Sequence, residues 1–158
     1  MKVGVIGNGF VGESQAFAFA KTNEVIVYDK DPLRSLGTLE EVHQSDFIFV
    51  AVPTPMKESG EHDLSIIEEV FTHAKEGPVY IIKSTVMPGT TESLRNKYPN
   101  LNIVFSPEFL TERKARLDFI NTARIVLGGD KPPAIKIVED LYRLRFPYTK
   151  IIKTDFAT

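Results

Sequence analysis

Short runs of hydrophobic residues alternate along the chain with longer segments whose hydrophobic positions recur at helical spacing. Most of the runs lack the polar alternation of a half-exposed strand, and they cover residues 3–6, 25–28, 47–52, 79–82, 103–105, 125–127 and 151–152. Such runs are typical of parallel strands covered by helices on both faces. Helices are predicted between them, over residues 11–21, 64–76, 91–97 and 133–145.

Residues at the ends of the helical segments fit helix boundaries. Asp63 is a candidate N-cap and Gly77 a candidate stop for the second helix. Thr90 is a candidate cap for the third helix, and two prolines open the fourth. The repeated strand–helix alternation predicts an α/β fold with an open, doubly wound, mostly parallel sheet and right-handed crossovers.

Length and composition narrow the class of protein. The 158 residues fit a single domain spanning residues 1–158, and a domain of this size buries roughly 70% of its unfolded surface. The net charge of −2 provides no basic field for nucleic acid or an anionic membrane. No segment approaches the ~20 hydrophobic residues that cross a bilayer, and the first hydrophobic run is too short for a signal peptide. We therefore expect a cytoplasmic protein with no nucleic-acid or membrane partner.

Two residue types bear on metal and covalent chemistry. The sequence has no cysteine, which excludes disulfides, thiolate metal sites and a cysteine nucleophile among these residues. His43, His62 and His73 lack the clustered spacing of zinc ligands. We expect no metal site.

The sequence GNGFVG, residues 7–12, lies between the first predicted strand and the first predicted helix. In a G-x-G-x-x-G motif, the first glycine permits a tight turn, the second lets the backbone approach a pyrophosphate, and the third lets helix and strand pack closely. These roles fall to Gly7, Gly9 and Gly12. The backbone of Phe10 and Val11 opens the helix, whose N-terminus attracts phosphate. The motif predicts a Rossmann-type dinucleotide site.

Asp29 ends the next predicted strand, about 20 residues after Gly7, where dinucleotide-binding proteins place a ribose-binding acid. A carboxylate at this position accepts hydrogen bonds from the adenine-ribose hydroxyls and repels the 2′-phosphate of NADP. We therefore predict NAD as the cofactor; the alternative is a purely structural glycine turn.

Other candidate residues follow the later predicted strands. Ligands of doubly wound sheets bind outside the carboxyl ends of the strands. The candidates are Val52, Pro53 and Thr54 at the end of the third run, Ser84 and Thr85 after the fourth, and Glu108 after the fifth. We expect them at the same edge as the glycine turn. In the alternative interpretation, the threonines only satisfy turn backbone and Glu108 caps a helix.

Glu112 follows Glu108 by about one helical turn in the sequence SPEFLTE. On a helix, this spacing places both carboxylates on about the same face. The pair is either the solvated start of a surface helix or a pair of site carboxylates.

The segments GNGFVG, VPTP, KSTVMPGT, SPEFLTE and ARIVLGG, with Asp29, occur in an order that resembles the N-terminal domain of the UDP-glucose/GDP-mannose dehydrogenase family. The resemblance covers nearly the whole chain. It implies oxidation of the C6 alcohol of a nucleotide sugar, UDP-glucose above all, to a carboxylate with two NAD, through an aldehyde and a cysteine thioester. It also allows for a homodimer.

The resemblance further implies roles for individual residues. Thr54 would contact the nicotinamide half of NAD. Thr85 and Glu112 would hold or activate the hydrolytic water, and Glu108 would be a carboxylate on the substrate side or behind it.

The chain departs from the family pattern at three places. The segment between residues 29 and 47 is short, and Thr111 stands where the family commonly has arginine. The family's catalytic lysine, asparagine and cysteine would follow the final IIKTDFAT, so these residues alone would not support the thioester route. Two alternatives stay open: the NAD-binding domain of a hydroxyacid dehydrogenase, and a non-catalytic NAD-sensing module.

Overall fold

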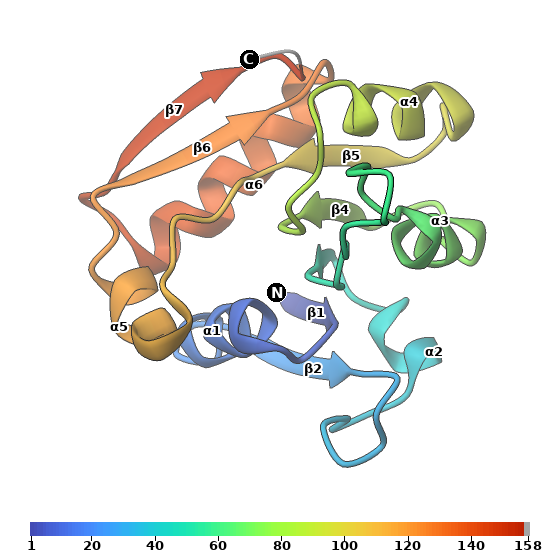
Figure 1. The fold of residues 1–158 in the computed structure, drawn as a ribbon. Coiled ribbons are helices and arrows are strands. Elements are labelled where there is room, and N and C mark those ends of the chain that lie inside the picture. The colour runs from blue at the N-terminus through green and yellow to red at the C-terminus, as the bar shows by residue number, and fades with distance from the viewer. Residues whose placement is uncertain (157–158) are drawn as a thin grey trace.

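Seven strands form one sheet in the computed structural model, which describes residues 1–156 (Figure 1). Their order across the sheet is β2-β1-β3-β4-β5-β6-β7. The strands are β1 (Lys2–Ile6), β2 (Glu24–Tyr28), β3 (Phe47–Val50), β4 (Val79–Ile82), β5 (Asn102–Phe105), β6 (Arg124–Gly128) and β7 (Lys150–Thr154). The predicted doubly wound α/β fold is confirmed.

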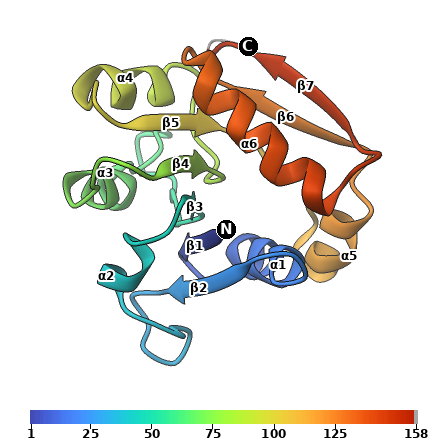
Figure 2. The ribbon, with the colours of Figure 1, turned by 180° about the vertical axis from the view of Figure 1, so that it is seen from behind.

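Helices cover both faces of the sheet. They are α1 (Phe10–Phe19), α2 (Leu39–Val42), α3 (Ser65–Thr72), α4 (Thr90–Lys97), α5 (Ala115–Ile120) and α6 (Pro132–Arg145), with a 3₁₀ turn at Glu112–Lys114. Helices α1, α5 and α6 share one hydrophobic core with the sheet, and α2, α3 and α4 share the other. Seen from behind, α1, α5 and α6 lie along the same side of the sheet (Figure 2). Within residues 1–156, no helix is long and hydrophobic enough to cross a bilayer.

Strand direction determines which residues meet at one edge. Strands β1 to β5 pair in parallel, so their carboxyl ends share an edge. Strand β6 is antiparallel to β5, which it contacts through the single pair Phe105 and Gly128, and β7 is parallel to β6. The residues that follow β6 and β7 therefore lie at the opposite edge, away from the predicted site.

Strand β3 is shorter than the hydrophobic run predicted. The run continues to residue 52, but the strand ends at Val50. Val50 O accepts hydrogen bonds from both Lys83 N, at 2.8 Å, and Ser84 N, at 3.2 Å. Ser84 Oγ then donates to Val52 O at 2.7 Å. A side-chain hydroxyl thus replaces the backbone ladder beyond Val50, which frees this segment to form part of a site.

The predicted boundaries of α3 are wrong. The N-cap is Leu64, not Asp63. The Asp63 carboxylate accepts a hydrogen bond from Ser65 N, the first residue of the helix, at 3.0 Å. The helix ends at Thr72, well before Gly77, whose φ of 113° serves the turn into β4 instead.

Other helix ends also differ from the predictions. Helix α4 starts at Thr90, with Gly89 as N-cap at a φ of 89°, because glycine adopts this conformation readily. The pattern missed α2, although Thr38 and Glu41 form a capping box at its start. It also missed α5, which follows the 3₁₀ turn.

Candidate functional site

A cavity of about 380 Å³ opens at the end of β1, the strand on either side of which the sheet is built in opposite directions. Strand β2 lies on one side of β1 and β3 on the other, and ligands bind doubly wound sheets at such a switch point. Of the sequence-predicted residues, Gly7, Gly9, Asp29, Val52 and Pro53 line this cavity. The structure thus brings the glycine turn, the end of β2 and the segment after β3 around one space.

The three glycines differ in what surrounds them. Gly7 has a φ of 93°, and a Cβ there would lie 2.5 Å from Ala51 O. A Cβ on Gly12 would overlap the Gly7 carbonyl oxygen, whereas a Cβ on Gly9 would meet nothing within 4 Å. Gly7 therefore permits the turn, Gly12 permits close packing of α1, and Gly9 leaves room for a ligand beside the helix N-terminus.

Phe10 and Val11 form the first turn of α1 and lie outside the lining of the cavity. The Phe10 side chain is exposed. Only the backbone of these residues is therefore placed to serve a phosphate at the helix N-terminus.

Asp29 ties the glycine turn to the end of β2. Its Oδ2 accepts a hydrogen bond from Asn8 N at 2.6 Å, and its Oδ1 accepts one from Asp31 N at 2.8 Å. The Asn8 side chain in turn donates to Arg34 O at 2.7 Å. A carboxylate offers about four acceptor sites, so each Asp29 oxygen can still accept a ribose hydroxyl.

Two basic residues at this end of the cavity were missed by the sequence analysis. Lys30 and Arg34 line it beside Asp29. Arg34 Nε lies 3.6 Å from Asp31 Oδ2, an exposed pair that leaves the guanidinium accessible. Basic residues are common in surface loops, so their positions shortly after the acid gave no distinct signal.

Hydroxyl groups join the ends of β3 and β4. Thr54 Oγ1 donates to Thr85 O at 2.5 Å, and Ser84 Oγ donates to Val52 O. Thr54 therefore satisfies turn backbone, as the structural alternative predicted for the threonines, and retains only acceptor capacity for a ligand. Ser84, which that alternative did not include, does the same. The Thr85 side chain is exposed at the carboxyl edge.

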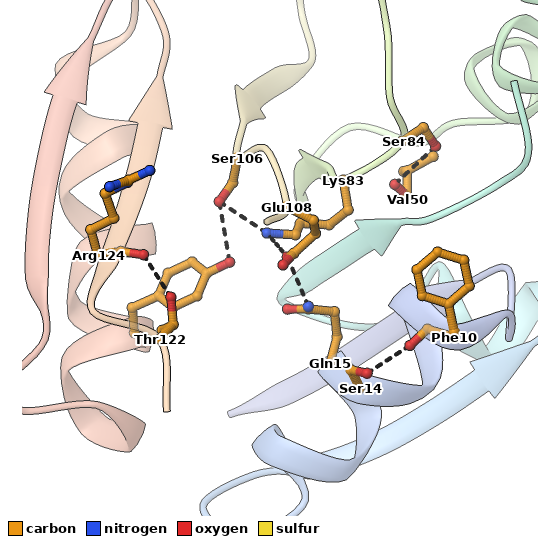
Figure 3. A network of polar contacts seen from close by, with 11 residues as sticks. Phe10, Ser14, Gln15, Val50, Lys83, Ser84, Ser106, Glu108, Thr122 and Arg124 are labelled. Atoms are coloured by element: carbon orange, nitrogen blue, oxygen red, sulfur yellow. Dashed lines mark hydrogen bonds and ion pairs between the residues drawn. The ribbon is translucent and has the colours of Figure 1, made fainter. Parts of the chain in front are cut away.

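Glu108 lies in a network of buried polar groups (Figure 3). Its Oε1 forms an ion pair with Lys83 Nζ and accepts a hydrogen bond from Gln15 Nε2 at 2.9 Å. Lys83 Nζ also donates to Ser106 Oγ at 3.3 Å, and this hydroxyl lies 3.3 Å from Tyr142 OH. The side chain of Lys83 is 2% exposed and that of Glu108 is 11% exposed. The sequence analysis missed Lys83 and Gln15.

The environment of this network sets the charge of its members. Burial is the largest single effect on Lys83 and opposes its ammonium form, but the contributions of Glu108 and Tyr142 together outweigh burial and raise the pKa of Lys83 above its usual value. Burial raises the pKa of the Tyr142 phenol. At neutral pH, Lys83 is therefore an ammonium and Tyr142 a neutral hydroxyl.

Glu112 is separated from this network. Residues 106–111 form neither helix nor strand, and Glu112 begins the 3₁₀ turn with its side chain exposed. The prediction that Glu108 and Glu112 share a helical face is wrong. Thr111 N and Oγ1 both donate to Asp118 Oδ2, at 2.9 and 2.6 Å, so α5 holds Thr111 in an extended conformation.

The sequence matches the UDP-glucose/GDP-mannose dehydrogenase family, NAD binding domain, over residues 33–145. It is 32% identical to the UDP-glucose 6-dehydrogenase of Campylobacter jejuni, over 90% of this chain and 45% of the relative. That alignment spans 177 positions, more than the 158 residues of this chain, so it contains gaps in this chain. The chain thus spans about half the length of such relatives.

Solved structures extend the match to the glycine turn. The structure of a UDP-glucose dehydrogenase from Pyrobaculum islandicum superimposes with a TM-score of 0.85 at 25% identity, covering 99% of this chain and 46% of that one. The UDP-D-ManNAc dehydrogenase of Pyrococcus horikoshii has a TM-score of 0.84 at 22% identity, with coverage of 99% and 47%. The second likeness shows the fold alone. The family match favours this family over the hydroxyacid dehydrogenases: the chain belongs to the UDP-glucose/GDP-mannose dehydrogenase family and matches its NAD-binding domain.

Proposed function

We propose that this chain is the NAD-binding part of a dehydrogenase that oxidises the C6 alcohol of UDP-glucose to a carboxylate. One observation carries the proposal: the open side of the glycine turn, Asp29 and the ends of β3, β4 and β5 all meet at one edge of the sheet. NAD bound across this edge would accept a hydride from the sugar C6. The curated relatives named UDP-glucose 6-dehydrogenase support the choice of sugar nucleotide.

At the adenine end, the proposal assigns the binding to groups that the cavity already presents. The N–H groups at the start of α1, reached over Gly9, would hold the pyrophosphate. Asp29 would accept the ribose hydroxyls. Its negative charge disfavours the 2′-phosphate of NADP, although the positive charges of Lys30 and Arg34 reduce the preference for NAD over NADP.

At the nicotinamide end, the proposal uses the segments after β3 and β4. Val52, Pro53 and Thr54 would border the ring, with the backbone of Ser84 and the exposed hydroxyl of Thr85 on the next strand. Thr85 and Glu112 would position the hydrolytic water. Glu112 suits the general base because its carboxylate is exposed, whereas the Glu108 carboxylate is engaged by Lys83 and Gln15.

Calorimetric titration of the chain with NAD⁺ tests the cofactor part of this proposal. We expect saturable one-to-one binding, and weaker binding of NADP⁺. A chain that is folded by circular dichroism and binds neither dinucleotide would contradict the proposal.

A complementation assay tests the substrate. The C-terminal half of a UDP-glucose 6-dehydrogenase relative would be added as a separate chain, and NADH formation followed at 340 nm. We expect NADH with UDP-glucose and less with GDP-mannose. In the assembled pair, Glu112→Gln should slow the step after the aldehyde and leave NAD⁺ affinity unchanged. Faster turnover of GDP-mannose than of UDP-glucose would contradict the choice of sugar.

A further inference from the structure

The buried ammonium of Lys83 has no role in the chemistry proposed above. Strand alternation explains how it enters the interior. Lys83 follows Ile81 on the face of β4 that packs against α1, α5 and α6, whereas Ser84 follows Ile82 on the other face. The side chain therefore extends from the sheet edge into a core of hydrophobic residues, with Nζ 5.9 Å from the centre of the Phe119 ring.

Three parts of the candidate site meet at one oxygen of Glu108. Gln15 comes from α1, the helix whose N-terminus faces the cavity. Lys83 immediately precedes the Ser84–Thr85 turn, and Glu108 follows β5. Figure 3 shows the three side chains converging from these separate elements. This contact therefore links the glycine helix to both strand ends.

We propose that Lys83 is a positioning residue for the dinucleotide site, an inference that rests on the proposed function. Its ammonium fixes the Glu108 carboxylate, and through Gln15 it sets the separation between α1 and the ends of β4 and β5. The phosphate end and the nicotinamide end of the cofactor are bound by these two sides. Lys83 thus determines whether one extended ligand fits both ends at once.

The ion pair is better suited to this task than hydrophobic residues of the same volume. Hydrophobic side chains would fill the space and stabilise the fold at least as well. They would not fix a direction, because dispersion contacts are weakly directional, whereas Oε1 meets a charged donor and an amide donor from two different elements. If the ion pair served only stability, replacing both residues with hydrophobic side chains would leave NAD⁺ binding unchanged.

The test is a comparison of NAD⁺ affinity and stability in Lys83→Met and in the double variant Lys83→Met/Glu108→Leu. Lys83→Met leaves a buried carboxylate without its cation, and the double variant removes that defect. We expect the thermal midpoint to fall in the single variant and to recover in the double variant. We expect NAD⁺ affinity to be about 10-fold weaker in both, a size typical of losing a group that orients a binding site.

Lys131→Met is the matched control. Lys131 Nζ donates to the backbone oxygens of Pro99 and Leu101, at 2.9 and 2.8 Å, away from the carboxyl edge of β1 to β5. Its loss should lower the thermal midpoint and leave NAD⁺ affinity unchanged.

The outcomes separate the hypotheses. Recovery of both the midpoint and NAD⁺ affinity in the double variant would show a purely structural role and overturn the inference, as would affinity within twofold of wild type in either folded variant. If Lys83→Met fails to fold, the double variant alone decides. Absence of NAD⁺ binding by the unmodified chain would instead overturn the proposed function, and the inference with it.

Discussion

The two ends of the candidate site are built in different ways. The switch-point cavity depends on two residues without side chains: Gly7 permits the turn and Gly9 leaves space. The strand-end junction, formed by Gln15, Lys83 and Glu108, is filled by long polar side chains that bind each other. One end thus offers room to a ligand, and the other offers rigidity.

This difference has an energetic consequence. The fold loses little stability when the cavity holds no ligand, because the Asp29 carboxylate accepts hydrogen bonds from two backbone N–H groups. The junction is sensitive to any single change, because removing one partner leaves a buried group without compensation. We therefore expect mutations at the junction to act first on stability, and mutations at the cavity to act first on binding.

Lys83→Met should produce the largest change in stability. Breaking a buried ion pair by removing one partner costs about 3–5 kcal/mol. The matched control is Lys136→Met, which removes an ion pair with Asp140. The side chains of Lys136 and Asp140 are 63% and 57% exposed. The control should leave the free energy of unfolding nearly unchanged, because water screens an exposed ion pair. Urea unfolding followed by circular dichroism measures both, and equal losses in the two variants would refute the distinction.

A pair of glycine variants separates packing from ligand space within the glycine motif. Gly12→Ala should destabilise by about 1–3 kcal/mol or more, because its Cβ would overlap the Gly7 carbonyl oxygen. Gly9→Ala should leave stability within about 0.5 kcal/mol, because its Cβ meets nothing. It should nevertheless weaken NAD⁺ binding, since the methyl group occupies the space left for the pyrophosphate. Unimpaired NAD⁺ binding by Gly9→Ala would place the pyrophosphate elsewhere.

Asp29→Ala should weaken NAD⁺ binding by about 10- to 100-fold, because hydrogen bonds to a charged group are worth roughly 1.5–3 kcal/mol. Asp46→Ala is the control: the Asp46 carboxylate accepts a hydrogen bond from Lys2 N at 2.8 Å, a similar contact at the opposite end of β1. Calorimetry should show unchanged affinity in the control. The same affinity in both variants would remove Asp29 from the ribose site.

The sequence predicted the switch-point cavity well because that region is governed by local backbone rules. A glycine motif after a strand fixes the turn, and an acid at the end of the next strand follows from the parallel pairing of β1 and β2. The strand pattern likewise located all seven strands, since continuous hydrophobic runs are distinctive.

The strand-end junction could not be predicted in the same way. Its contacts join residues far apart in sequence, such as Gln15 and Glu108, and no local pattern encodes them. The expected helix through Glu108 and Glu112 failed because tertiary contacts, the Lys83 ion pair and the Asp118 bonds to Thr111, overrode the helical spacing. One signal was present: by strand alternation, Lys83 falls on the same face as Ile81 and therefore points into the core.

The smallest expected effect is that of His43, which lies at the amino-terminal edge of the sheet, opposite the edge of the candidate site. It serves as a reference for the comparison between the two ends of the site. His43 is buried there, with its Nδ1 3.3 Å from Tyr80 OH and its Nε2 without a partner among the described residues. Burial, and then the charge of Lys75, lower the pKa of His43 against the opposing charge of Glu40.

Unfolded chains therefore take up a proton below about pH 6.5 that the folded chain does not. Stability should fall as the pH drops below that value, and His43→Gln should lack this component. NAD⁺ affinity should show no difference between the two proteins across the same pH range, since His43 does not line the cavity. Matching pH profiles of unfolding would exclude His43 as the titrating group.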